Sequence, residues 1–238
     1  MTASTKRAIV LAGSAVAVLI VLALAVPAVG RIIQTTEQAS HDLPVGIVSL
    51  TVDGDVGDVA IRVAGPGEEP GAVATVRSGV TEPTVEAVVS GDAAVLSDTC
   101  PNSWWDNCSV EWAVVVPAGT GVTVEHSVGD ITVVEVTGAV SLSSDVGDIT
   151  ATGLGSDTVR AHSDVGDVVL DLVSPPEDLQ VSSSTGDVRV TVPDDGTSYR
   201  VLAETTIGQL TNTIGSDNSQ SRIIDVRTSV GDISLHRG

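Results

Sequence analysis

A short segment centred on glycine recurs seven times along this 238-residue chain. From the second copy onward the glycines are spaced by 18, 19, 20, 22 and 23 residues, whereas 72 residues separate the first two. A period near 20 residues is typical of proteins built from stacked copies of one unit. The corner pairs are Gly57-Asp58, Gly129-Asp130, Gly147-Asp148, Gly166-Asp167, Gly186-Asp187, Gly208-Gln209 and Gly231-Asp232.

Each copy has the pattern of a strand, a corner and a second strand. In the third copy, Val140 and Leu142 stand seven and five positions before the glycine, and Ile149 and Ala151 continue the apolar alternation after the aspartate. The corner absorbs one step of alternation, as a turn or bulge does. Glycine supplies a positive φ, while the oxygen-bearing side chain two positions earlier and the following aspartate are expected to cap amides of the turn.

The repeat predicts an all-β fold, a right-handed parallel β-solenoid in which each strand pairs with its counterpart one copy later. The chain has no Phe, one Tyr and three Trp, so a thin aliphatic core is expected. The alternative is an antiparallel β-sandwich in which each Gly-Asp pair is a hairpin turn. We expect the repeat domain at 44–238, with 122–238 regular and 44–121 an irregular, membrane-proximal part that holds a Cys loop.

The N-terminus predicts a membrane anchor. Residues 8–29 are 22 uncharged and mostly apolar residues, long enough to cross a bilayer. Lys6 and Arg7 in the short tail 1–7 favour a cytoplasmic N-terminus, so the chain is expected to be single-pass in the cell membrane with its C-terminal domain extracytoplasmic. A cleaved signal peptide is the alternative. Residues 30–43 are interpreted as a linker.

Two cysteines and three tryptophans stand apart from the repeats. Cys100 and Cys108 are expected to form a disulfide in a translocated domain. Trp104 and Trp105 lie between them, and Trp112 follows. These tryptophans are candidates for contact with a glycan or protein partner, or else plug one end of the stack or lie at the membrane interface.

The chain is strongly acidic, with a formal net charge of −20. Nucleic acid and anionic lipid are therefore poor partners. In a stack, the corner aspartates would form a column with carboxylates about 4.8 Å apart, which repel unless they are hydrogen-bonded or bridged by a cation. Calcium is conceivable there, with turn capping as the alternative. No motif for a metal centre, cofactor or catalytic nucleophile is present, so none is predicted.

The serial Ser/Asp-x-Gly-Asp-Val/Ile units resemble the bacterial putative-adhesin family of β-strand-repeat envelope proteins, a domain of unknown function. The run from Val114 to Gly119, with Pro117, is similar to that family's entry into its repeats, and Val192-Pro193 followed by Tyr199-Arg200-Val201 resembles its late repeat pattern. The resemblance implies an envelope-associated β-solenoid without assigned catalytic residues. Gln209 and Asn212 depart from the pattern, which predicts local irregularity in the sixth copy.

The sequence therefore predicts a non-enzymatic, membrane-anchored extracytoplasmic protein that acts as an adhesin-like, scaffolding or envelope-sensing binding module. Its partner would be an envelope or cell-surface protein or a glycan. Two alternatives remain: an enzyme that acts on cell-wall carbohydrate through carboxylates on one face of the stack, and a calcium-dependent surface binding protein.

Overall fold

The computed structural model describes residues 35–79, 81–101 and 108–238, and this part of the chain is all β. The predicted span 8–29 lies outside it, and no helix among the described residues is long and apolar enough to cross a membrane. The strands are β1 (Thr35–Asp42), β2 (Ser49–Val56), β3 (Val59–Val63), β4 (Gly71–Ser78), β5 (Thr84–Ser90), β6 (Ala93–Thr99), β7 (Ser109–Val116), β8 (Gly121–Val128), β9 (Ile131–Val134), β10 (Val140–Val146), β11 (Ile149–Leu154), β12 (Thr158–Val165), β13 (Val168–Leu172), β14 (Asp178–Thr185), β15 (Val188–Val192), β16 (Arg200–Ile207), β17 (Leu210–Asn212), β18 (Ile223–Val230) and β19 (Ile233–Arg237).

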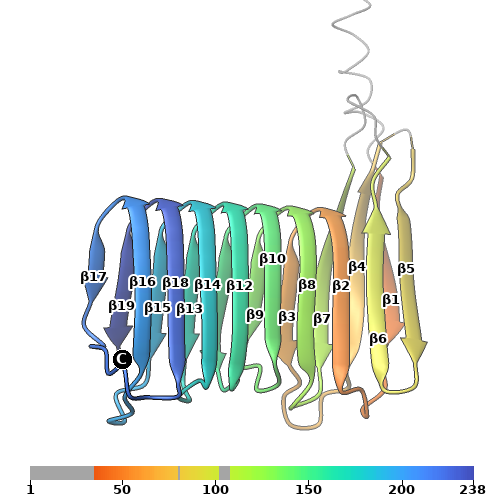
Figure 1. The fold of residues 1–238 in the computed structure, drawn as a ribbon. Helices are drawn as coiled ribbons and strands as arrows, with labels where there is room; N and C mark the ends of the chain where they lie inside the picture. The colour runs from red at the N-terminus through yellow and green to blue at the C-terminus, as the bar shows by residue number, and fades with distance from the viewer. Residues whose placement is uncertain (1–34, 80, 102–107) are drawn as a thin grey trace, which may run out of the picture.

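The strands form two mixed sheets that face each other (Figure 1). The ten-stranded sheet has the order β1-β4-β7-β3-β9-β11-β13-β15-β19-β17, and the nine-stranded sheet has the order β16-β18-β14-β12-β10-β8-β2-β6-β5. Each glycine-centred copy contributes one strand to each sheet, and we call such a pair of strands a layer. Because the corner joins two sheets, the strands on either side of it do not pair with each other, and these corners are not hairpin turns.

Neighbouring layers pair in parallel and in register. In the nine-stranded sheet Val140 of β10 pairs with Val122 of β8 on one side and with Val159 of β12 on the other. In the other sheet Ile149 of β11 pairs with Ile131 of β9 and with Val168 of β13. Equivalent residues of successive copies therefore lie side by side, as expected for a stacked repeat.

The core fills the space between the sheets with aliphatic columns. The inward positions of β10 and β11, which include Leu142 and Ile149, are almost completely buried, and the same holds for their counterparts in β8, β9, β12 and β13. Burial of each such side chain contributes about 1.5–3 kcal/mol relative to exposure. Small columns of Val, Leu, Ile and Ala fit the narrow interior, which explains the scarcity of aromatic residues.

The last two copies are stacked in reversed chain order, which the sequence did not indicate. The seventh copy, β18 and β19, pairs with β14 and β15, and the sixth copy, β16 and β17, pairs onto the outside of the seventh. The expectation that each copy pairs with the next in sequence is therefore wrong at this point. The sixth copy is the end layer, and its strand β17 has only three residues, all exposed.

The other end of the stack is closed by antiparallel strands. β6 and β7 form one more layer beside β2 and β3, β5 pairs antiparallel with β6, and β4 pairs antiparallel with β7. Thr35–Asp42, predicted as part of a linker, is instead strand β1, which pairs along its whole length with β4. The polar composition of this segment suits an edge strand, since an edge faces water and is protected by polar side chains.

The corner glycines allow the layers to approach closely. Their φ angles lie between 136° and 155°. A side-chain carbon on Gly147 would lie 2.0 Å from the carbonyl oxygen of Gly129 in the adjacent layer. No other residue fits, because both the backbone conformation and the space exclude a Cβ atom.

Replacement of Gly147 by alanine is expected to lower the free energy of unfolding by about 3 kcal/mol or more, since steric overlap adds to backbone strain. The matched control is Gly67→Ala, because Gly67 also has a positive φ of 79° but a Cβ atom added to it would meet nothing within 4 Å. That control should cost about 1 kcal/mol. Chemical denaturation of both variants measures the difference, and equal losses would contradict the close-approach explanation.

Candidate functional site

The corner aspartates form a hydrogen-bonded column along the stack. Asp148 donates its backbone N–H to the Oδ1 of Asp130 at 2.9 Å, and Asp167 does the same to Asp148 at 2.8 Å. The same contact recurs through Asp58, Asp187 and Asp232 and ends at Gln209, whose N–H donates to Asp232 at 2.7 Å. These carboxylates therefore bond to the next layer, rather than to their own turn as expected.

This column has a structural explanation that needs no metal ion. Each carboxylate accepts a charge-assisted N–H bond from its neighbour. Within the residues that the structure describes, no group of three or more His, Cys, Asp or Glu side chains is placed to hold a metal ion. Calcium at the corners therefore finds no support in the geometry of the described residues.

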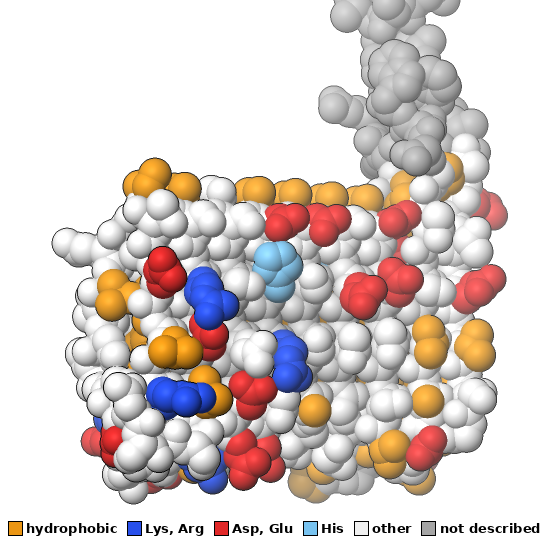
Figure 2. All heavy atoms as spheres, viewed as in Figure 1, with side chains coloured by type: hydrophobic (Ala, Val, Ile, Leu, Met, Phe, Trp, Pro, Cys, Tyr) orange, Lys and Arg blue, Asp and Glu red, His pale blue; other side chains and the backbone are white. Residues whose placement is uncertain are grey.

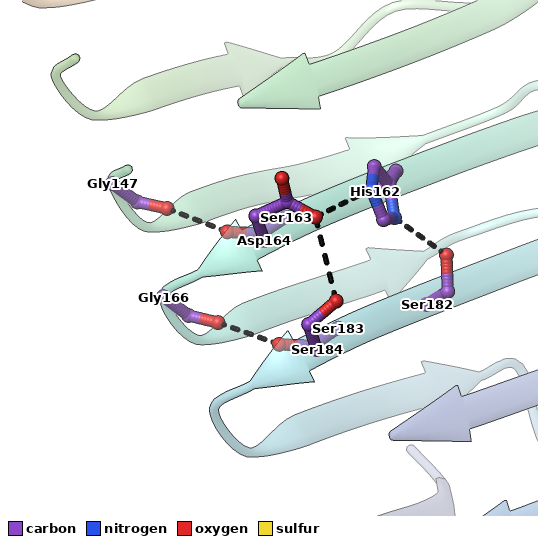
Figure 3. Close-up of polar contacts among 8 residues, drawn as sticks. All are labelled: Gly147, His162, Ser163, Asp164, Gly166, Ser182, Ser183 and Ser184. Atoms are coloured by element: carbon purple, nitrogen blue, oxygen red, sulfur yellow. Dashed lines mark hydrogen bonds and ion pairs between the residues drawn. The ribbon is translucent and has the colours of Figure 1, made fainter. Parts of the chain in front are cut away.

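A largely buried row of hydroxyl groups, three positions before the corner glycine in five of the seven copies, was not recognised in the sequence. Ser163 donates to the carbonyl oxygen of Gly147 and Ser183 to that of Gly166, both at 3.1 Å (Figure 3). Thr205 and Thr228 make the equivalent bond to the corner glycines of their neighbouring layers. The signal was present, because five of the seven copies have Ser or Thr at this position. The capping role was instead expected of the exposed row one residue later.

The outer face of the nine-stranded sheet carries a shallow depression of about 340 Å³, which we call the polar trough. It lies across β10, β12, β14 and β18, and Figure 2 shows basic, acidic and histidine side chains gathered on this face. Its polar lining residues are Ser141, Ser143, Arg160, His162, Gln180, Ser182, Asp225 and Arg227. Because outward positions of neighbouring strands lie side by side, side chains from different copies meet here.

Ion pairs and hydrogen bonds hold the side chains of the polar trough. Arg160 bonds to Asp178 at 3.1 Å, and Gln180 donates to the same carboxylate. Arg227 bonds to Asp225 at 2.7 Å. Hydrogen-bond donors and acceptors thus alternate along the polar trough. Its two arginines carry positive charge, although the chain as a whole has a net charge of −20.

His162 lies between a serine and an aspartate, as in a catalytic triad. Its Nδ1 is 2.8 Å from Ser182 Oγ and its Nε2 is 3.2 Å from Asp164 Oδ1 (Figure 3). Ser182, however, lies within β14 and is paired on both sides, with His162 of β12 and Arg227 of β18. The amides around it belong to the sheet ladder and cannot form the oxyanion site that acyl transfer requires. The arrangement suits binding rather than catalysis.

Of the three tryptophans considered for contact with a partner, the structure describes only Trp112. Trp112 is only 1% exposed, and its Nε1 donates to Asp98 Oδ1 at 2.8 Å, so the expected ligand contact at Trp112 is not possible in this structure. Trp112 instead fills the end layer beside the antiparallel strands, where a large side chain replaces the small aliphatic residues of the regular layers. Trp104 and Trp105 lie outside the described residues.

The disulfide between Cys100 and Cys108 is confirmed, with the two Cα atoms 5.7 Å apart. Cys100 directly follows β6 of one sheet and Cys108 directly precedes β7 of the other. The bridge thus stands where the other layers have a Gly-Asp corner. Asp55, next to the first corner, accepts the N–H of Cys100 at 2.9 Å and attaches the bridge to the regular stack.

A second and larger hollow of about 490 Å³ lies on the outer face of the ten-stranded sheet. Ala60, Ala113 and Thr132 form part of its floor, and the ion pair between Arg62 and Glu68 lies near its rim. Its surface is mainly apolar. We regard the polar trough as the better candidate for recognition of a polar ligand, because donors and acceptors from four strands meet there.

No protein-family model matches the chain, and neither does any curated protein. A solved structure of a putative cell adhesion protein from Clostridium sporogenes is 12% identical over 86% of this chain and 100% of that chain, with a TM-score of 0.49. A putative adhesin from Bacteroides fragilis is 12% identical over 86% and 97%, with a TM-score of 0.47. One from Parabacteroides distasonis is 12% identical over 86% and 97%, with a TM-score of 0.31.

The similar structures are all named as a putative adhesin or putative cell adhesion protein of a bacterium, which matches the family that the sequence resembles. Their TM-scores lie below 0.5, so we base the functional conclusion on the geometry of this chain alone.

Asp98 gives the N-terminal end of the stack a predictable pH dependence. Burial raises the pKa of Asp98, opposed by hydrogen bonds from Trp112 and from the N–H of Asp55. Because the folded state holds this proton more tightly than the unfolded chain, the contribution of Asp98 to the free energy of unfolding rises as the pH falls from 7 through the folded-state pKa. Wild type should therefore gain stability relative to Asp98→Asn on acidification, measured by urea denaturation. A difference that is constant with pH would contradict this.

Proposed function

We propose that this protein is a membrane-anchored, extracytoplasmic binding module, adhesin-like and non-enzymatic, built as a right-handed parallel β-solenoid. The observation that carries the proposal is the polar trough, a set of fixed polar side chains on the flat outer face of a long stack. Residues 8–29 supply the anchor, with Lys6 and Arg7 on the cytoplasmic side. The disulfide supports an oxidising compartment outside the cytoplasm.

The solenoid interpretation is supported by the column contacts. Each regular layer repeats one strand from each sheet, one glycine corner and one aspartate bond to its neighbour. Stacked repeats of this kind are rigid and extended, which suits presentation of a binding surface.

The chemistry of the polar trough favours a hydroxyl-rich ligand. Arg160, Arg227 and Gln180 are donors, the aspartates beside them are acceptors, and the serine hydroxyls can act as either. A sugar hydroxyl also donates and accepts, so a glycan of the cell envelope matches this mixed surface. A polyanion such as a nucleic acid is a poor match for a chain of net charge −20.

An enzymatic role on cell-wall carbohydrate is not proposed. The Ser182–His162–Asp164 arrangement lacks free backbone donors at the serine, because that serine is paired on both sides within the sheet. Two carboxylates of this face, Asp178 and Asp225, bond to Arg160 and Arg227. These contacts fix the positions of the side chains on a binding surface. None of them identifies a carboxyl group that would act as a general acid.

Binding of the full-length chain, reconstituted in lipid nanodiscs, to the purified envelope polysaccharide of its host tests this function. Arg160→Ala and Arg227→Ala should each weaken binding about 10-fold or more, since each removes charge-assisted hydrogen bonds worth about 1.5–3 kcal/mol. Arg77→Ala is the matched control, because it removes the same charge from an ion pair with Glu111 away from the trough.

The polysaccharide should be recovered at its original length, since no turnover is expected. If Arg77→Ala weakened binding equally, or if both trough variants bound as tightly as wild type, the polar trough would not be the binding surface. Release of new reducing ends would favour the enzymatic alternative instead.

A further inference from the structure

A line of exposed aliphatic side chains runs along the corner side of the stack, the side on which the Gly-Asp corners lie. Each of these residues directly precedes a corner glycine, and in-register pairing places them side by side. Figure 2 shows apolar side chains along this edge. We call them the valine ridge: Val128 (45% exposed), Val146 (47%), Val165 (50%), Val230 (44%) and Ile207 (65%).

The valine ridge is longer than any other row of exposed aliphatic residues in the part of the chain that the structure describes. It crosses six adjacent layers, interrupted only by Thr185, and at about 4.8 Å per layer it is about 24 Å long. Val48 and Val173 are also exposed, but they lie singly at the opposite side, where strands of successive layers are connected. Single exposed aliphatic residues are ordinary, whereas a contiguous apolar line indicates a contact surface.

The first described residue lies on this same side of the molecule. Thr35 pairs with Ser78 at the end of β4, and the adjoining Arg77 pairs with Ser109 at the start of β7. The carbonyl of Val110, the next residue of β7, is packed against the corner at Gly57. β1 therefore begins at the corner side, at the end of the stack that lies beyond the first ridge layer, as its position in Figure 1 shows.

The chain between the predicted membrane span and β1 is short. The span ends at Val29, six residue steps before Thr35, and six steps reach at most about 20 Å when fully extended. The opposite side of the stack is farther from the anchor by the length of a strand, about 25 Å for eight residues. The anchor therefore holds the corner side closer to the bilayer than the opposite side.

We propose that the valine ridge is a lipid-contact surface, along which the stack lies on the bilayer with its strands upright. This inference rests on the membrane anchoring of the proposed function. The tether keeps the ridge at a high effective concentration near the lipid, so five aliphatic side chains suffice for contact although they would bind weakly on their own. The polar trough then faces sideways, where a partner in the envelope can reach it.

Charge restricts the kind of lipid. Asp145 and Asp164 lie one residue before the ridge positions, and the corner aspartates lie two residues after them, so carboxylates flank the ridge on both sides. Anionic headgroups would be repelled. The ridge is therefore a contact for a bilayer whose headgroups are zwitterionic and carry no net charge.

Depth-dependent fluorescence quenching tests the orientation. The full-length chain is reconstituted in phosphatidylcholine vesicles with a fluorophore on Val146→Cys, or on the matched control Val173→Cys, which is 62% exposed on the opposite side. Lipids with a nitroxide near the headgroup should quench the label at 146 at least threefold more than the label at 173. Replacement of a third of the lipid by phosphatidylglycerol should reduce the quenching at 146.

The outcomes separate the two proposals. Flotation of the chain with vesicles after carbonate extraction reports the anchor alone, and a chain that does not float refutes both the anchor and the lipid contact. A chain that floats with equal quenching at 146 and 173, or with none at 146, leaves the anchor intact and overturns the lipid contact. Circular dichroism of both labelled variants verifies that each remains folded, as expected for exposed positions.

Discussion

The close approach of neighbouring corners is the constraint on which the rest of this structure depends. Along the regular layers, the carbonyl oxygen of one corner glycine lies within 1.8–2.1 Å of the point that a Cβ atom would occupy on the next. With that spacing fixed, the hydroxyl three positions before the glycine reaches a glycine carbonyl of the adjacent layer in four copies, and the aspartate after the glycine accepts the next layer's N–H. One backbone requirement thus determines three columns of contacts.

The column of aspartate bonds has a direction, and this explains the irregular sixth copy. Each carboxylate accepts from the next layer outward, and the last acceptor is Asp232, which receives the N–H of Gln209. In the end layer a carboxylate at position 209 would find no following N–H among the described residues. Glutamine there, and polar Asn212 in place of an inward aliphatic residue, suit a layer that faces solvent. The departure from the repeat pattern therefore marks the end of the stack.

The same geometry explains why the corner side is uniform along the molecule and the outer face of the nine-stranded sheet is varied. The corner side is restricted to glycine, aspartate and a β-branched residue in almost every layer, so it repeats along the molecule and gives the continuous ridge. The outward positions of the nine-stranded sheet have no such restriction. Side chains that occur once each, such as Arg160, His162 and Arg227, come together there from different copies. Specific recognition is therefore expected on the face, and uniform contact on the edge.

Some features could be predicted because they depend on local chemistry. The all-β class follows from the alternation of apolar residues on both sides of each corner, and the bond between Cys100 and Cys108 could be predicted from their short spacing. The hydroxyl row was visible as a recurring Ser or Thr, but its acceptor lies in another layer, so its role was not. The strand Thr35–Asp42 was missed because its pairing with β4 depends on a partner about 30 residues or more away along the chain.

The sequence by itself determined the unit of this protein: two strands, a glycine corner and the side chains that face inward. The tertiary structure alone decided the order of the last two layers, the antiparallel closure of the first end and the grouping of the polar trough. The physical reason is that the copies are locally interchangeable. Any of them offers the same inward pattern to a neighbour, so the choice of neighbour depends on long-range packing and on which copy best tolerates solvent at the end.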